Sequence, residues 1–303
     1  MRRIILCFLL LPILASAQSV FPGTAYIKSI TPLWTGERSE DGRPKVTADL
    51  LERLKNISVE EAWGYLRNKG YQNQYEGDWF ILKPDIVMTG RVVTAQYAPQ
   101  RPDLEAVLKE AGKNEGRIGA MNSWPIDVLH EGDIYIADSY GKIIDGTLIG
   151  DNLGNAIYAK SKNGVVFNGS VRDIEGLESI DGFNAFTKGH DPSYIQQMML
   201  TGLNVPLRMG RAFVLPGDVL LAKKGGVVFI PPHLLQDLLI NSEFVQLRDK
   251  FGHQRLREGK YTPGQIDTQW TNEIKEDFLA WLNTQKLPME RKVLDEYMKS
   301  RTW

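Results

Sequence analysis

The spacing of apolar residues predicts alternating strands and helices along the middle of the chain. Short apolar runs bounded by turn residues indicate strands, and apolar residues three or four positions apart indicate helices. The expected strands cover residues 85–95, 133–138, 164–168 and 185–187. A helix is expected over residues 102–111, a turn and a helix over residues 148–162, and residues 170–179 are expected to lead to a short helix. Because strands and helices alternate, the pattern predicts βαβ units and the α/β fold class.

Two helices are expected ahead of this central region. One begins at Thr47, and the second is capped by the run Ser58-Val59-Glu60-Glu61. Residues 18–46 carry Pro, Gly and Trp without periodicity, so we expect an extended arm that packs on the body or on a neighbouring subunit. From Val205 onward the pattern changes to short strands and turns, and a helix is expected to open over residues 232–239.

Residues 241–303 form a C-terminal extension with a different character. The run from Phe251 to Gln265 is polar, basic and aromatic, and we expect it to be a loop. Apolar spacing predicts a helix from Trp270 to Leu282 and another from Met289 to Lys299. Two interpretations stay open: a helical cap that extends the core or a subunit interface, or a loop that reaches an active site and widens the substrate range.

The N-terminus has the pattern of a secretory signal peptide. A charged start, Met1-Arg2-Arg3, precedes an apolar run from Ile4 to Leu14 and the small residues Ala15-Ser16-Ala17. We expect cleavage after Ala17 and a periplasmic or secreted protein; a buried N-terminal helix is the alternative. The only cysteine, Cys7, lies inside this segment, so we expect neither disulfides nor a lipoprotein membrane anchor in the mature chain.

Composition limits the remaining function classes. The chain has 303 residues and 43% hydrophobic content, which is enough for one sizeable core with an appendage. Its formal net charge is -1. Nucleic-acid binding would favour a basic face, so this charge gives no support for a nucleic-acid partner.

The segment from Gly150 to Asp173 carries the most suggestive chemistry. A polar turn at Asp151 leads through a helical run to an apolar strand, which ends in Arg172-Asp173. The spacing suits a turn, a short helix and a return strand, which can bring Asp151 back beside the strand end. A guanidinium there could grip a carboxylate ligand, and the two carboxylates could hold a hard divalent cation or its waters. A structural Arg–Asp ion pair is the alternative.

This segment also carries a family resemblance that covers about residues 50–239. It resembles the RraA-like family, which includes the regulator of ribonuclease activity A and the class II 4-hydroxy-4-methyl-2-oxoglutarate aldolases. Similar motifs are Gly90-Arg91-Val92-Val93-Thr94, and Leu215-Pro216-Gly217-Asp218-Val219 with the later run 225–231. The resemblance implies a layered α/β body of the swivelling β/β/α type over residues 47–240, with an extra helical C-terminal extension, assembled as a homotrimer or hexamer with sites between subunits.

The resemblance also implies roles for the charged residues. Arg172 would bind the carbonyl or carboxylate oxygen of a small acidic substrate. Asp173 would ligate Mg²⁺ or Mn²⁺, mostly together with water, and Asp151 would orient a water that acts as acid or base. The family's aldolases also use a carboxylate from near the C-terminus of a neighbouring subunit. Glu243 and Glu258 are the candidates here, and neither is assigned.

Two further groups complete the expected site. The backbone amides of Asn152, Leu153 and Gly154 could receive an anionic carboxylate if they open the helix. His190, in the run Gly189-His190-Asp191-Pro192, is expected just after a strand end. It is either a structural turn residue or a general acid or base near the metal.

Three functions follow from these residues. The first is a metal-dependent lyase that forms an enolate next to a bound carboxylate, by aldol cleavage or decarboxylation of 2-oxo or sugar-derived acids. The second is a dehydratase that acts on oligosaccharides containing uronic acids. The third is an RraA-like binding protein without turnover.

Overall fold

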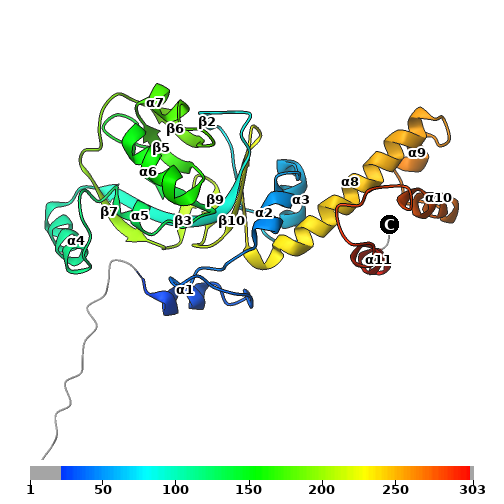
Figure 1. Cartoon of the computed structure of the whole chain (residues 1–303), viewed down its shortest axis with the longest axis horizontal. Coiled ribbons are helices and arrows are strands. Elements are labelled where there is room, and N and C mark those ends of the chain that lie inside the picture. Colours follow the sequence, from blue (N-terminus) through cyan, green and yellow to red (C-terminus); the bar gives the residue numbers. More distant parts are fainter. Residues whose placement is uncertain (1–21, 301–303) are drawn as a thin grey trace, which may run out of the picture.

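The computed structural model describes residues 22–300, whose elements are shown in Figure 1. The helices are α1 Thr24–Ile30, α2 Ala48–Leu54, α3 Val59–Asn68, α4 Pro102–Asn114, α5 Trp124–Asp127, α6 Asp151–Ser161, α7 Ile174–Glu178, η1 Pro232–Leu234, α8 Leu235–Arg257, α9 Pro263–Ile266, α10 Asn272–Leu282 and α11 Arg291–Lys299. The strands are β1 Tyr75–Glu76, β2 Phe80–Ile81, β3 Met88–Pro99, β4 Asp133–Asp138, β5 Val165–Val171, β6 Ala185–His190, β7 Met198–Leu203, β8 Leu207–Met209, β9 Ala212–Val214, β10 Val219–Lys223 and β11 Gly226–Ile230. The predicted α/β fold class, with a helical C-terminal region, is confirmed.

One mixed sheet organises the body. Its strand order is β1-β11-β10-β3-β4-β5-β6-β2, and β7 pairs with β3 beside this path. Strands β3, β4, β5 and β6 run parallel, as the βαβ pattern predicted. Strands β1 and β2 stand at opposite ends of the order but are joined by Gly77–Trp79. The sheet therefore curls until this short connection links its two edges.

Alternation along the strands divides apolar side chains between two faces of the curled sheet. Val92 pairs with Ile134 in one cluster, whereas the next pair, Val93 and Tyr135, belongs to another. Leu207 and Met209 of the β8–β9 hairpin pack with Val92 and Ile134. The hairpin thus fills the concave side, and the other face is left for helices to cover.

Helices cover the outer face in two places. Over the parallel strands, Ile157 of α6 and Leu177 of α7 pack with Phe167 of β5. Over β10 and β11, residues of α2, α3 and the start of α8 form a second cluster. The predicted cap of α3 is confirmed: the Ser58 hydroxyl accepts from Glu61 N at 3.1 Å, and the Glu61 carboxylate accepts from Ser58 N at 2.7 Å.

The N-terminal segment is anchored by a buried ion pair. Arg43 is 1% exposed, and its Nη2 lies 2.8 Å from Asp133 Oδ2 at the start of β4. Its Nε lies 2.6 Å from Asp41 Oδ2. The prediction of an extended arm is wrong for residues 24–30, which form α1, where Ile27 supplies a buried contact.

The C-terminal extension has its own apolar cluster. Helix α8 leaves the sheet, and the remaining helices lie along it (Figure 1). Phe244 and Phe251 of α8 pack with Phe278 and Trp281 of α10. The loop expected from Phe251 onward is therefore wrong as far as Arg257, because its apolar residues continue the helix. The two predicted helices are present as α10 and α11.

Two expectations about the ends of the chain concern membranes and export. Among residues 22–300, no helix combines the length and the apolar character that crossing a bilayer would need. The expected signal peptide, residues 1–17, lies outside the described residues.

Candidate active site

The start of α6 lies beside the end of β5, as the spacing of Asp151 and Arg172 predicted. The segment leading into α6 runs parallel to the end of β5, with Leu148 N donating to Ser170 O at 3.0 Å. Arg172 N then donates to Ile149 O at 3.0 Å. These two backbone bonds fix the helix start against the residues that follow the strand.

Arg172 and Asp173 lie directly against Gly150. Arg172 Nε lies 3.5 Å from Asp173 Oδ2, and both side chains are about two-fifths exposed. Asp173 has a φ of 57°, in the left-handed region, which turns its side chain back at the start of α7. A Cβ on Gly150 would overlap Asp173 Oδ2 and would lie 3.1 Å from Arg172 Nε. A larger residue at position 150 would therefore displace the Asp173 carboxylate from this position.

Arg172 borders two open pockets. The first, with a cavity volume of about 90 Å³, is also lined by Asp151, Asn152 and Leu153 at the start of α6. The second, with a cavity volume of about 430 Å³, is lined by Asp173 and by residues at the end of β6 and just after it. The structure thus brings the predicted charged residues together around one guanidinium, which can reach a ligand in either pocket.

The hydrogen bonds of α6 change the expectation for its amides. Gly154 N donates to Gly150 O at 2.9 Å within the helix, so its N–H is not available to an anion. Asn152 N donates to Asp151 Oδ1 at 2.7 Å, so an incoming carboxylate would have to displace the Asp151 side chain. Including Gly154 among the anion-binding amides was therefore wrong. For Leu153, which lines the first pocket, the role stays a prediction.

His190 lies on the opposite side of Arg172 from Asp151. It is the last residue of β6 and pairs in register with Val171, because the strand runs three residues beyond the expected 185–187; its expected place after the strand end was therefore wrong. Its ring is exposed and lies with its centre 4.8 Å from that of the Phe80 ring, tilted by 46°. It borders the same pocket as Asp173. Next to it, the Ser193 hydroxyl donates to Asp191 and lowers the pKa of that carboxyl.

A family model described as Aldolase/RraA matches residues 47–229. This stretch is well over half of the chain. The chain belongs to the RraA-like family.

Two curated relatives each match part of this RraA-like chain. Protein DlpA of Legionella pneumophila is 26% identical over 206 residues, which is 67% of this chain and 31% of that protein. A candidate 4-hydroxy-4-methyl-2-oxoglutarate aldolase of Photobacterium profundum is 29% identical over 105 residues, which is 32% of this chain and 63% of that protein. The match covers less than two thirds of either relative's own length.

Solved structures share the RraA-like fold. Streptomyces coelicolor RraAS2, described as an unusual member of the RNase ES inhibitor RraA protein family, superposes with a TM-score of 0.59 and 22% identity over 72% of this chain and 98% of that one. An uncharacterised protein of Pseudomonas syringae gives 0.59 and 19% identity over 73% and 93%. Identities this low establish the fold alone.

The donor set of this RraA-like site suits a hard cation that keeps most of its water. Among residues 22–300, no three His, Cys, Asp or Glu side chains gather as a metal cage would require. One chain therefore offers the carboxylate of Asp173, packed over Gly150, with Asp151 nearby at the start of α6. One or two carboxylates plus water is the ligand set that Mg²⁺ accepts. The residues present fit such an ion.

The two acidic candidates from the extension lie elsewhere. Glu243 forms a bidentate ion pair with Arg53 of α2, at 2.9 and 2.8 Å. Glu258 accepts from Arg255 at 2.8 Å near the far end of α8. Both carboxylates are engaged in this chain, away from Arg172.

Sequence reasoning missed three residues that line the first pocket. Asn122 Nδ2 donates to Leu148 O at 2.7 Å and so supports the segment that leads into α6. Tyr194 and Ile195 come from the stretch after β6, and Tyr194 is 60% exposed. Their place just after the run containing His190 was the only signal, and nothing marked Asn122.

Proposed function

We propose that this protein is a divalent-metal-dependent lyase that forms an enolate next to a bound carboxylate. The observation that carries the proposal is the position of Arg172 between two open pockets, with Asp173 paired to its guanidinium and Asp151 across the start of α6. The aldolase name of one relative supports the same reaction class. The substrate would be a small 2-oxo or sugar-derived acid.

Arg172 would orient this substrate. A guanidinium presents parallel N–H donors that match a carboxylate or an adjacent carbonyl oxygen. Its side chain is 41% exposed, so it can reach a ligand while Nε stays near Asp173. Binding the acid group there would place the reacting carbon in one of the two pockets.

Asp173 would hold Mg²⁺ or Mn²⁺ mainly through the ion's water shell. When bound, such an ion supplies Lewis-acid stabilisation for the negative charge of an enolate. The carboxylate of Asp151 would orient a water molecule, and this water would act as the acid or base. His190, in the pocket shared with Asp173, is the other group that could move a proton.

A dehydratase that acts on oligosaccharides containing uronic acids is the second candidate. The pocket next to Asp173 and His190 is open and has a cavity volume of about 430 Å³, more room than a small 2-oxo acid needs. A uronic acid also carries a proton on the carbon next to its carboxylate. Removing that proton and expelling the β-hydroxyl would give an unsaturated sugar. We also propose that the chain is exported. We further propose that it assembles as a homotrimer or hexamer, and size-exclusion chromatography with light scattering would test this oligomeric state.

A substrate panel tests the proposed reaction. The protein would be assayed on 2-oxo acids, 4-hydroxy-2-oxo acids and uronic-acid oligosaccharides, with Mg²⁺, with Mn²⁺ and with EDTA. Pyruvate release indicates carbon–carbon cleavage, and the unsaturated-uronate absorbance band without pyruvate indicates dehydration. Arg172→Ala and Asp173→Asn should each lower turnover at least about 100-fold.

Arg101 offers a matched control. It forms an exposed ion pair with Asp103 at 2.8 Å and lines neither pocket at Arg172, so Arg101→Ala should leave turnover unchanged. Full activity of Arg172→Ala would contradict the proposed site. Absence of turnover on the whole panel would favour the third possibility, an RraA-like binding protein.

A further inference from the structure

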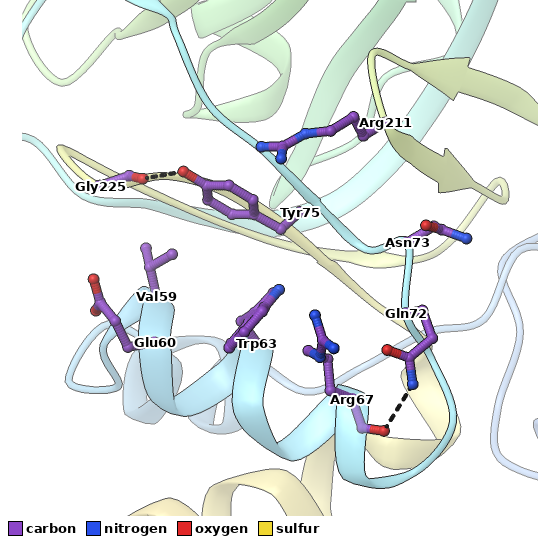
Figure 2. Close-up of a pocket in the computed structure, with 9 residues that line it drawn as sticks. All are labelled: Val59, Glu60, Trp63, Arg67, Gln72, Asn73, Tyr75, Arg211 and Gly225. Atoms are coloured by element: carbon purple, nitrogen blue, oxygen red, sulfur yellow. Dashed lines mark hydrogen bonds between the residues drawn. The ribbon is translucent and has the colours of Figure 1, made fainter.

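A third open pocket lies between α3 and strand β1. In the strand order of the sheet, β1 stands at the opposite end from β6 and β2. The pocket has a cavity volume of about 320 Å³, and it shares no lining residue with the pockets at Arg172. Figure 2 shows side chains from α3 on one side, and Tyr75 of β1 with Arg211 of the β8–β9 turn on the other. The lining residues are Val59, Glu60, Trp63, Arg67, Gln72, Asn73, Tyr75, Arg211 and Gly225.

Two aromatic rings give this pocket its walls. Trp63 lies on α3 and is 39% exposed, an unusual position for the largest apolar side chain. Tyr75 faces it from β1 and is fixed, because its hydroxyl donates to Gly225 O at 2.9 Å. A Cβ on Gly226 would lie 2.7 Å from Tyr75 Cε2, so the ring rests directly on this turn. The tyrosine is therefore held in place before any ligand arrives.

Each ring carries an arginine. The guanidinium of Arg67 lies 4.7 Å from the centre of the Trp63 ring, and that of Arg211 lies 5.3 Å from the centre of the Tyr75 ring. Within residues 22–300, the Arg67 guanidinium has no carboxylate partner. The two cations thus flank the aromatic pair, and at least one keeps its full capacity to bind an anion.

A nearly buried carboxylate sets the position of Arg211. Glu76 is 8% exposed, and its Oε2 accepts from Arg211 N at 2.7 Å and lies 3.5 Å from Arg211 Nε. Its other oxygen lies 3.3 Å from Lys188 Nζ, so the charge of Glu76 is matched by Lys188. The terminal nitrogens of Arg211 therefore stay available to a ligand.

We propose that this pocket binds a uronate residue of an acidic oligosaccharide, away from the site at Arg172. Sugar rings place their C–H faces on aromatic side chains, and the exposed polar groups of Glu60, Gln72 and Asn73 can reach hydroxyl groups. The arginines accept the carboxylate. This inference concerns binding alone and holds whether or not the lyase proposal is correct.

The charge of the lining selects this class of ligand. Two arginines and one glutamate leave one net positive charge, which matches a single carboxylate. A nucleoside di- or triphosphate brings more negative charge and would meet the carboxylate of Glu60. A neutral sugar would leave both guanidiniums without an anion.

Calorimetric titration of the full chain with trigalacturonate tests the proposal. Binding should be measurable at low ionic strength, and the fully methyl-esterified trisaccharide should bind at least about tenfold more weakly. Trp63→Ala and Arg67→Gln should each weaken binding of trigalacturonate about tenfold, as expected for anchor residues of a binding site. Circular dichroism would confirm that both variants are folded.

Lys69 supplies the matched control. It lies at the end of the same helix and carries the same charge as Arg67, but it does not line the pocket, so Lys69→Ala should bind as the parent does. Equal binding of the ester and the acid, tighter binding of ADP than of trigalacturonate, or unchanged binding by Trp63→Ala and Arg67→Gln would each overturn the proposal. Arg172→Ala should keep this binding, so failure here is distinguishable from failure of the lyase proposal.

Discussion

The carboxylate of Asp173 occupies the space that a side chain on Gly150 would need. A Cβ on Gly150 would overlap Asp173 Oδ2, although the φ of -118° at this residue is one that any amino acid adopts. The constraint is thus steric and concerns only the carboxylate and the neighbouring guanidinium. A methyl group added at Gly150 should therefore displace these two side chains without changing the backbone.

Gly150→Ala should therefore lower turnover at least about 100-fold with little loss of stability. The added methyl group moves Asp173 and disturbs its ion pair with Arg172, and small errors in the position of reacting groups are costly. Gly64→Ala is the control, because nothing lies within 4 Å of a Cβ there. Steady-state kinetics and thermal unfolding of both variants would be compared. Parental turnover by Gly150→Ala would argue against a catalytic role for this contact.

The buried pair of Arg43 and Asp133 predicts a large effect on stability. Removing Arg43 leaves Asp133, which is 1% exposed, without one of its two arginine partners. Breaking a buried pair costs about 3 to 5 kcal/mol. Chemical denaturation of Arg43→Ala should show a loss of this size. Lys45→Ala removes an exposed ion pair with Glu37 and should change stability by less than about 1 kcal/mol.

Asp218 predicts an unusual pH dependence of folding stability. Burial raises the pKa of this carboxyl to about 7, while its Oδ2 accepts from Leu215 N at 2.8 Å. The folded chain therefore keeps a proton that the unfolded chain releases near pH 4. As the pH rises through this window, the contribution of Asp218 to stability falls by at most about 1.4 kcal/mol per pH unit, and it changes little above pH 7.

Asp218→Asn removes this titration and can still accept from Leu215. The stability of the variant relative to the parent should increase between pH 4 and pH 7 and then stay constant. Denaturation curves at several pH values would measure the difference. A difference that is independent of pH would show that Asp218 titrates normally in the folded chain.

The ion pair between Arg53 and Glu243 predicts that replacing one partner lowers folding stability more than replacing the other. Glu243 is 5% exposed at its side chain, whereas Arg53 is 24% exposed and also lies 3.9 Å from Asp49. Arg53→Ala leaves a buried carboxylate without its partner, so it should cost more than Glu243→Ala, by about 1 kcal/mol or more. The double variant with both Arg53→Ala and Glu243→Ala should cost less than the sum of the single changes. If the two single effects simply add up to that of the double variant, the ion pair does not stabilise the fold.

The sequence was most informative where local patterns decide the structure. Residues 133–138 were predicted as a strand and form β4, because a short apolar run between turns has few alternatives in an α/β chain. The closeness of Asp151 and Arg172 followed from the length of the turn, helix and strand between them. The family membership predicted from three motifs is confirmed by the matched residues 47–229.

Features that depend on distant partners escaped prediction. The continuation of α8 through Phe251 depends on Phe278 and Trp281, which lie almost thirty residues further along the chain. Gly154 N donates to a backbone oxygen inside α6. A shift of one residue in the start of the helix therefore changes which amides are free to bind an anion, and a sequence pattern does not fix the start that closely. No sequence pattern marked Asn122, because its role is a single bond to a backbone oxygen.

The joining of β1 and β2 has a consequence for the order of events during protein synthesis. The connection at residues 75–81 is made early, yet its partners are Phe186 and Thr187 on one side and Val227 and Val228 on the other. On the ribosome this early segment must wait, unpaired, until more than a hundred further residues have emerged. The body cannot complete its sheet before the start of α8 is being translated, so the C-terminal helices are added to a core that has only just closed.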